Sequence, residues 1–231
     1  MRLRYLGLYN HRADADMSFA QQMKVILTPR ETNVFARLNS PNRIQNFLDS
    51  LPINFESHGE TYMSPRRVLT SQTAHCFEGA LFVAAALAFH GHKPLLMDFQ
   101  TRYDDEDHVV ALFRQNGLWG AFSKTNHAIL RYRDAVYKTP RELAMSYFHE
   151  YYVWDGRKSL RAYSAPFDVS RFAPERWVTA NDELEWLVET LDTSKHFPIV
   201  SKINLHELRR ASRIELRNLK IVEWKKNPRD S

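Results

Sequence analysis

One stretch near the middle of the chain, residues 73–92 (TAHCFEGALFVAAALAFHGH), constrains the fold more than any other part of the sequence. From Phe77 to Phe89 the only charged residue is Glu78, and apolar residues occupy every side of a helical wheel. Such a helix must be buried on nearly all sides, and its many small residues let neighbouring elements approach its backbone closely. Cys76, the only cysteine of the chain, lies at the start of this predicted helix.

Strand patterns follow the helix. KPLLMDFQ (93–100) predicts a strand, and HVVALFRQNGLWGAFSKT (108–125) predicts a hairpin around Asn116-Gly117, a dipeptide typical of tight β-turns. Amphipathic helices are predicted at residues 41–51, 139–152, 181–191 and 204–226, and a loop with one turn after Ser64-Pro65 precedes Cys76. The predicted fold class is therefore α+β, with helices around a small antiparallel sheet.

The hairpin register predicts where His108 lies. With Asn116-Gly117 in the turn, counting back along the strands pairs His108 with Thr125 and places His108 and Ser123 on the same face. If the helix that begins at Cys76 packs over this face, the thiol and the imidazole come within hydrogen-bond reach. The helix N-terminus then favours the thiolate, which is the nucleophilic form of cysteine.

The order of these elements resembles the transglutaminase-like superfamily of thiol enzymes. MSPRRVLTSQTAHCFEGALFVAAALAFHGHKPLLM (63–97) is similar to the loop, nucleophile helix and strand of that superfamily, and 108–125 is similar to its histidine strand and the strand after it. Within the superfamily, the chain resembles uncharacterised bacterial proteins, which also continue as SKTNHAILRYRD and RELAMSYFHEY. The resemblance spans about residues 40–130. It implies a transglutaminase-like or papain-like core over about 40–150 in a single domain of residues 1–231, with a C-terminal helical extension over about 180–226.

The resemblance also assigns roles to individual residues. It implies Cys76 as the nucleophile and His108 as the general base and acid. The superfamily usually has an aspartate at the third position, where this chain has Ser123; Asn126, three residues on, is the alternative, because asparagine orients the imidazole in papain-like triads. A serine accepts a hydrogen bond from the ring but does not stabilise imidazolium as a carboxylate does. Gln72 is the candidate oxyanion donor, beside the backbone N–H of Cys76.

No motif in the sequence indicates a cofactor or a metal. The histidines at residues 90–92 are typical of a helix C-terminus, where the dipole favours them, and DDED (104–107) is typical of a solvated loop. There is no glycine-rich phosphate loop. The net charge of +5 is spread along the chain, and the basic residues of the C-terminal segment are interspersed with glutamates, so nucleic-acid binding is not expected.

The composition predicts a cytoplasmic protein without membrane contact. The N-terminus has no apolar signal-peptide core, and the longest uncharged run, residues 79–91, is too short to span a bilayer. A single cysteine rules out an intramolecular disulfide framework. With 44% hydrophobic residues the chain can bury a sizeable core.

Two functions remain open from the sequence. The first is a thiol hydrolase or acyltransferase that acts on an amide or peptide bond, in a peptide, a protein or a small amide. The second is a catalytically weak or inactive binding module that keeps the fold, an alternative supported by the missing aspartate.

Overall fold

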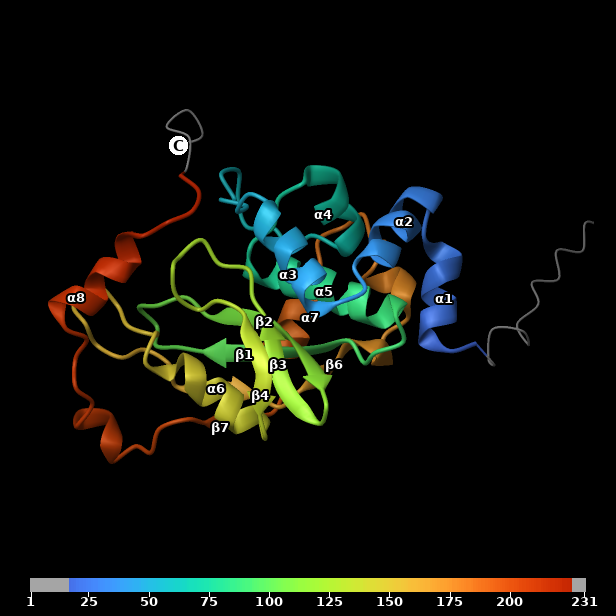
Figure 1. The fold of residues 1–231 in the computed structure, drawn as a ribbon. Helices are drawn as coiled ribbons and strands as arrows, with labels where there is room; N and C mark the ends of the chain where they lie inside the picture. The colour runs from blue at the N-terminus through green and yellow to red at the C-terminus, as the bar shows by residue number, and fades with distance from the viewer. Residues whose placement is uncertain (1–16, 226–231) are drawn as a thin grey trace, which may run out of the picture.

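The computed structural model describes residues 17–225; the ends of the predicted single domain, residues 1–16 and 226–231, lie outside this part. The described residues form an open antiparallel sheet in the order β4-β3-β2-β1-β5-β7, with β6 also paired to β1 (Figure 1). The strands are β1 (Leu95–Gln100), β2 (His108–Gln115), β3 (Leu118–Phe122), β4 (Arg133–Tyr137), β5 (Ala162–Ser164), β6 (Phe167–Asp168) and β7 (His196–Pro198). The predicted α+β class and the antiparallel sheet are confirmed.

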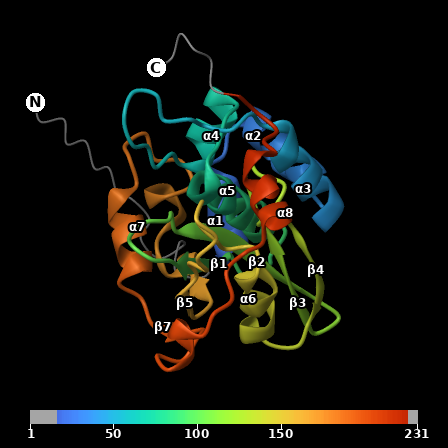
Figure 2. The ribbon, with the colours of Figure 1, turned by 90° about the vertical axis from the view of Figure 1, so that its left-hand side faces the viewer.

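Helices cover both faces of the sheet (Figures 1 and 2). On one face α5 (Cys76–Phe89) packs against the strands, and α5 is covered in turn by α1 (Phe19–Ile26), α2 (Pro29–Arg37), α3 (Pro41–Ser50) and α4 (Pro65–Ser71). Buried residues of α7 (Glu185–Asp192) belong to the same core. The other face packs against α6 (Pro140–Phe148). Two short 3₁₀ turns, η2 (Val169–Arg171) and η3 (Pro174–Arg176), lie between β6 and α7.

Alternation along β2 divides the core between the two faces. Val109, Ala111 and Phe113 pack with α5, whereas Val110 and Leu112 pack with α6. Because the central strands are buried on both faces, their sequences are nearly continuous apolar runs rather than alternating ones.

The central helix α5 is as buried as its sequence predicts, since every residue from Phe77 to Phe89 is buried. A Cβ added to Gly79 would lie 2.6 Å from the Cβ of Lys124, so only glycine permits this close approach. The Lys124 ammonium donates hydrogen bonds to the main-chain oxygens of Leu48 and Leu51 at the end of α3. None of the described helices is both long and apolar enough to cross a membrane.

The predicted hairpin and its register are confirmed. Asn116 and Gly117 have φ values of 51° and 82°, as a type I′ turn requires, and Gln115 pairs with Leu118. The ladder continues in this register to the pair of Ala111 and Phe122.

The face of the sheet that α5 covers differs from the expectation. His108 lies two residues before Val110 in β2, so both belong to the same face of the strand. The Val110 side chain faces α6, so α5 does not pack over the face that carries His108. The apolar side chains of α5 pack instead on the alternate residues of β2. His108 is the first residue of its strand, and Cys76 is the first residue of its helix. Both residues therefore lie where their elements begin, beyond the packed faces, and line the same cavity.

The predicted continuous helix over residues 204–226 is wrong. The structure has only η4 (Asn204–His206), α8 (Arg213–Leu216) and η5 (Arg217–Lys220) in this region, and residue 226 lies outside the described part. Backbone groups in between bond to distant segments instead: Ala211 N–H donates to the Gly156 oxygen over 2.8 Å, and residues 221–223 pair with 126–128. Upstream, β7 of the same predicted extension joins the sheet. Tertiary backbone pairing thus replaces the helical hydrogen bonds.

Candidate active site

A cavity of about 400 Å³ opens at the N-terminal end of α5. Its walls, which define what we term the Cys76 cleft, comprise Ile53, Asn54, Phe55, Glu56, His75, Cys76, Asp105, Glu106, Asp107, His108, Lys124, Thr125, Asn126, His127, Ile129, Leu130, Glu150, Tyr151, Tyr152 and Leu219. The thiol and the imidazole that the sequence singled out, Cys76 and His108, therefore line one cavity, although they come from different elements.

A second histidine lies beside the thiol. His75 directly precedes α5, and its Nδ1 lies 3.9 Å from the Cys76 sulfur. Its Nε2 lies 2.7 Å from the main-chain oxygen of Thr61. Because a carbonyl oxygen only accepts hydrogen bonds, Nε2 must carry the proton, and Nδ1 is the nitrogen that faces sulfur. His75 is thus positioned to exchange a proton with the thiol.

A buried carboxylate organises the residues around His75. Glu78 is fully buried and accepts hydrogen bonds from the His75 backbone N–H (2.9 Å), the Thr61 hydroxyl (2.8 Å) and the Met63 backbone N–H (3.1 Å). The Asn54 amide also donates to it. One carboxylate oxygen lies 3.4 Å from His75 Nε2. Glu78 therefore caps the start of α5, fixes the loop that supplies Thr61, and places negative charge behind the imidazole.

His108 is held in one tautomer by the residue opposite it. Its Nε2 lies 2.8 Å from the Ser123 hydroxyl, and both side chains are buried. The single hydroxyl proton of Ser123 is donated to the main-chain oxygen of Leu130 over 2.5 Å. Ser123 must therefore accept from His108 Nε2–H, which leaves Nδ1 as the free nitrogen of the ring.

The electrostatics of the cleft favour a thiolate. Burial alone would raise the pKa of the Cys76 thiol, but hydrogen bonds and charge interactions with His108 and His75 hold that pKa well below its usual value. Burial also opposes the charged form of His75, yet the Cys76 thiolate, the Glu78 carboxylate and the Thr61 carbonyl raise the His75 pKa to about 9. These interactions favour a thiolate beside an imidazolium over a neutral thiol beside a neutral ring.

The remaining sequence candidates do not contact the His108 ring, although Asn126 lines the cleft. Both polar atoms of the Asn126 amide bond to the Trp224 backbone, at 3.0 Å and 2.8 Å, so the ring contact belongs to Ser123. Gln72 ends α4 in the left-handed conformation, and its amide donates to the Leu69 oxygen over 2.6 Å. Gln72 does not line the cleft. The structure thus brings three predicted residues together and leaves Asn126 and Gln72 outside that group.

Sequence reasoning missed two members of this site, His75 and Glu78. Both carried a signal: His75 adjoins the only cysteine, and Glu78 is the only charge in a helix that is otherwise apolar. A charge in such a helix needs buried partners, and these come from the loop that precedes it.

The described residues contain no group of three or more side chains suited to hold a metal ion. What the arrangement does offer is nucleophilic and proton-transfer chemistry at one sulfur atom.

No protein-family model matches this chain, and the search of curated proteins found no match to it.

Proposed function

We propose that the protein is a thiol enzyme of transglutaminase-like fold, in which Cys76 attacks the carbonyl carbon of an amide or peptide. One observation carries the proposal: a thiol at the N-terminus of a buried helix lies beside His75 Nδ1 and lines one cavity together with His108. A nucleophile, a base and a third group that orients the base are the usual components of covalent catalysis.

The chemistry follows from these positions. The Cys76 thiolate forms a carbon–sulfur bond with the carbonyl carbon, and the carbonyl π electrons move to oxygen. When the tetrahedral species collapses, the carbon–nitrogen bond breaks, and the leaving amine takes a proton from an imidazolium in the cleft. Water or an acceptor amine then gives its proton to the imidazole and attacks the thioacyl carbon, which releases the thiolate. Hydrolysis is the favoured outcome, because water needs no acceptor site of its own.

The proposed fold rests on the order of the site elements. The cysteine begins a central helix, the histidine begins a strand of the next hairpin, and the third residue directly follows the second strand of that hairpin. This is the order that the superfamily resemblance implies. Ser123 stands in place of its usual aspartate, so the ring is oriented by a neutral acceptor.

Intact-mass measurement tests the activity directly. The protein is incubated with a library of peptide and small amide substrates and quenched in acid, and we expect a thioacyl adduct on Cys76 together with released amine. Cys76→Ser is expected to give neither, and His108→Ala to slow both steps. Undiminished product release by Cys76→Ser would refute the proposal.

A binding module without turnover is the second candidate, and Ser123 is the observation that favours it. A serine whose only proton is committed to Leu130 stabilises imidazolium less than a carboxylate would. In that case, wild type and Cys76→Ser would retain the same library members with equal affinity, and neither would release product.

A further inference from the structure

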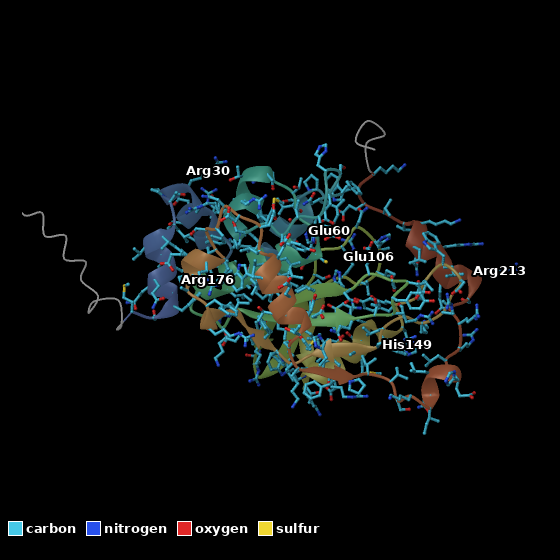
Figure 3. All side chains as sticks on the ribbon, turned by 180° about the vertical axis from the view of Figure 1, so that it is seen from behind. Arg30, Glu60, Glu106, His149, Arg176 and Arg213 are labelled. Atoms are coloured by element: carbon cyan, nitrogen blue, oxygen red, sulfur yellow. The ribbon has the colours of Figure 1, made fainter. Side chains whose placement is uncertain are left out.

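The Cys76 cleft has an acidic mouth. The loop between β1 and β2 brings Asp105, Glu106 and Asp107 to its wall; Figure 3 labels Glu106. Among the ion pairs formed by residues 17–225, none involves these three carboxylates. Glu150, on another wall, differs because it pairs with Arg133 at 2.7 Å. Uncompensated negative charge is thus concentrated on the loop that leads to His108.

No lysine or arginine of the cleft wall offsets this charge. Lys124 is the only such residue that lines the cleft, and its ammonium donates to the Leu48 and Leu51 carbonyls of α3 instead. The cationic group that remains is the His75 imidazolium, and it is directed to the thiolate. A substrate entering the cleft therefore meets carboxylates whose charge nothing else in the wall neutralises.

A separate observation concerns Tyr151, another residue of the cleft wall. Tyr151 lines the cleft and is only 2% exposed, yet its hydroxyl has no hydrogen-bond partner. Burial raises the pKa of Tyr151 well above its usual value, and negative charge on Cys76 and Asp105 raises it further, so the hydroxyl remains a donor. A buried donor without an acceptor is costly unless a ligand supplies one. The carbonyl oxygen of an acyl group attacked by Cys76 is such an acceptor.

We infer that the Cys76 cleft takes an amide or peptide with a positively charged group next to its scissile carbonyl. The carbonyl oxygen accepts a hydrogen bond from the Tyr151 hydroxyl, and the cationic group lies against Asp105 and Glu106. This inference rests on the proposed function and adds to it the class of substrate.

A pair of aldehydes of matched shape tests the inference without any known substrate. An aldehyde adds reversibly to a thiol as a hemithioacetal, with carbon bonded to sulfur and a proton on the former carbonyl oxygen, and so blocks alkylation of Cys76. N-acetyl-lysinal carries a cation, whereas N-acetyl-norleucinal has a similar chain without one. Iodoacetamide labelling measured by intact mass reports Cys76 alone, because the chain has one cysteine.

At low ionic strength, lysinal is expected to protect Cys76 at a concentration about fivefold lower than norleucinal. A difference of this size in binding is what one or two partly exposed ion pairs contribute. The double variant Asp105→Asn/Glu106→Gln is expected to abolish this difference. Asp134→Asn/Glu175→Gln, which changes the charge equally at exposed positions outside the cleft, is expected to keep it. Tyr151→Phe is expected to weaken protection by both aldehydes about fivefold, the value of one hydrogen bond between uncharged groups.

Equal protection by the two aldehydes, or a difference that persists in Asp105→Asn/Glu106→Gln, would overturn the proposed substrate class while leaving the thiol chemistry intact. Undiminished protection in Tyr151→Phe would overturn the role of its hydroxyl. If Cys76 fails to react with iodoacetamide between pH 6 and 9, the proposed function itself fails, and the substrate class fails with it.

Discussion

Replacing His75 by alanine removes the imidazole whose Nδ1 lies 3.9 Å from the Cys76 sulfur. Because the pKa of His75 is raised to about 9, its ring is cationic below that pH and stabilises the thiolate throughout the neutral range. Without it, the pKa of Cys76 is expected to rise. The variant should therefore lose thiolate at pH 6, whereas near pH 10 neither protein depends on the imidazolium.

The size of the effect follows from the separation of the two charges. At 3.9 Å and an effective dielectric constant of 20, the attraction is about 4 kcal/mol, and desolvation of the charges opposes it. If half remains, about 2 kcal/mol, the thiolate population falls about thirtyfold at a pH below the thiol pKa of both proteins. A thiolate of higher pKa is a better nucleophile, by about fourfold for this change. The net alkylation rate should therefore fall about sevenfold in that acid range, and the two rates should converge near pH 10, where His75 is neutral in wild type.

The assay is the second-order rate of iodoacetamide alkylation from pH 5 to 10, followed by intact mass. His92→Ala is the matched control, because His92 is exposed beyond the other end of α5 and does not line the Cys76 cleft. Its profile should superimpose on that of wild type, whereas the profile of His75→Ala should lie below it in the acid range and converge with it near pH 10. A His75→Ala profile that coincides with wild type at every pH would refute the electrostatic reasoning.

Four further variants test how the site is built. Ser123→Ala should lower turnover about tenfold by freeing the imidazole, whereas Asn126→Ala should keep the turnover rate; equal rates for both would remove the third residue from the mechanism. Gly79→Ala should lower the unfolding free energy in urea by about 1–3 kcal/mol, because the new Cβ meets Lys124, and an unchanged midpoint would contradict that packing. Glu78→Gln should cost about 1–3 kcal/mol in the same assay, since an amide group cannot accept all the hydrogen bonds of the carboxylate; wild-type stability would contradict this account.

Local signals were sufficient to predict part of the fold and the site. The uncharged run after Cys76 and the Asn116-Gly117 turn each determine their structure within a few residues, and the turn sets the register that joins His108 to Ser123. These are short-range features, for which periodicity and backbone preference are reliable guides.

The missed features depend on contacts between distant segments. The orientation of His75 comes from the Thr61 carbonyl, which no local pattern specifies. Asn126 has the right chemistry to orient an imidazole, but the Trp224 backbone occupies both ends of its amide. The amphipathic pattern over 204–226 did not produce one helix, since backbone groups there found partners near Gly156 and Ala128. Tertiary pairing overrides propensity at each of these places.

The way the C-terminal segment is attached determines which substitutions the fold tolerates beside the cleft. Residues 212–225 contain no buried side chain and attach through hydrogen bonds to residues 126–128 and to the Tyr152 hydroxyl, while Leu219 forms part of the cleft wall. The part of the cleft wall that Leu219 forms is therefore held by surface hydrogen bonds and not by buried side chains of residues 212–225. Substitutions at Leu219 and its neighbours can therefore alter the shape of the cleft at almost no cost in folding stability.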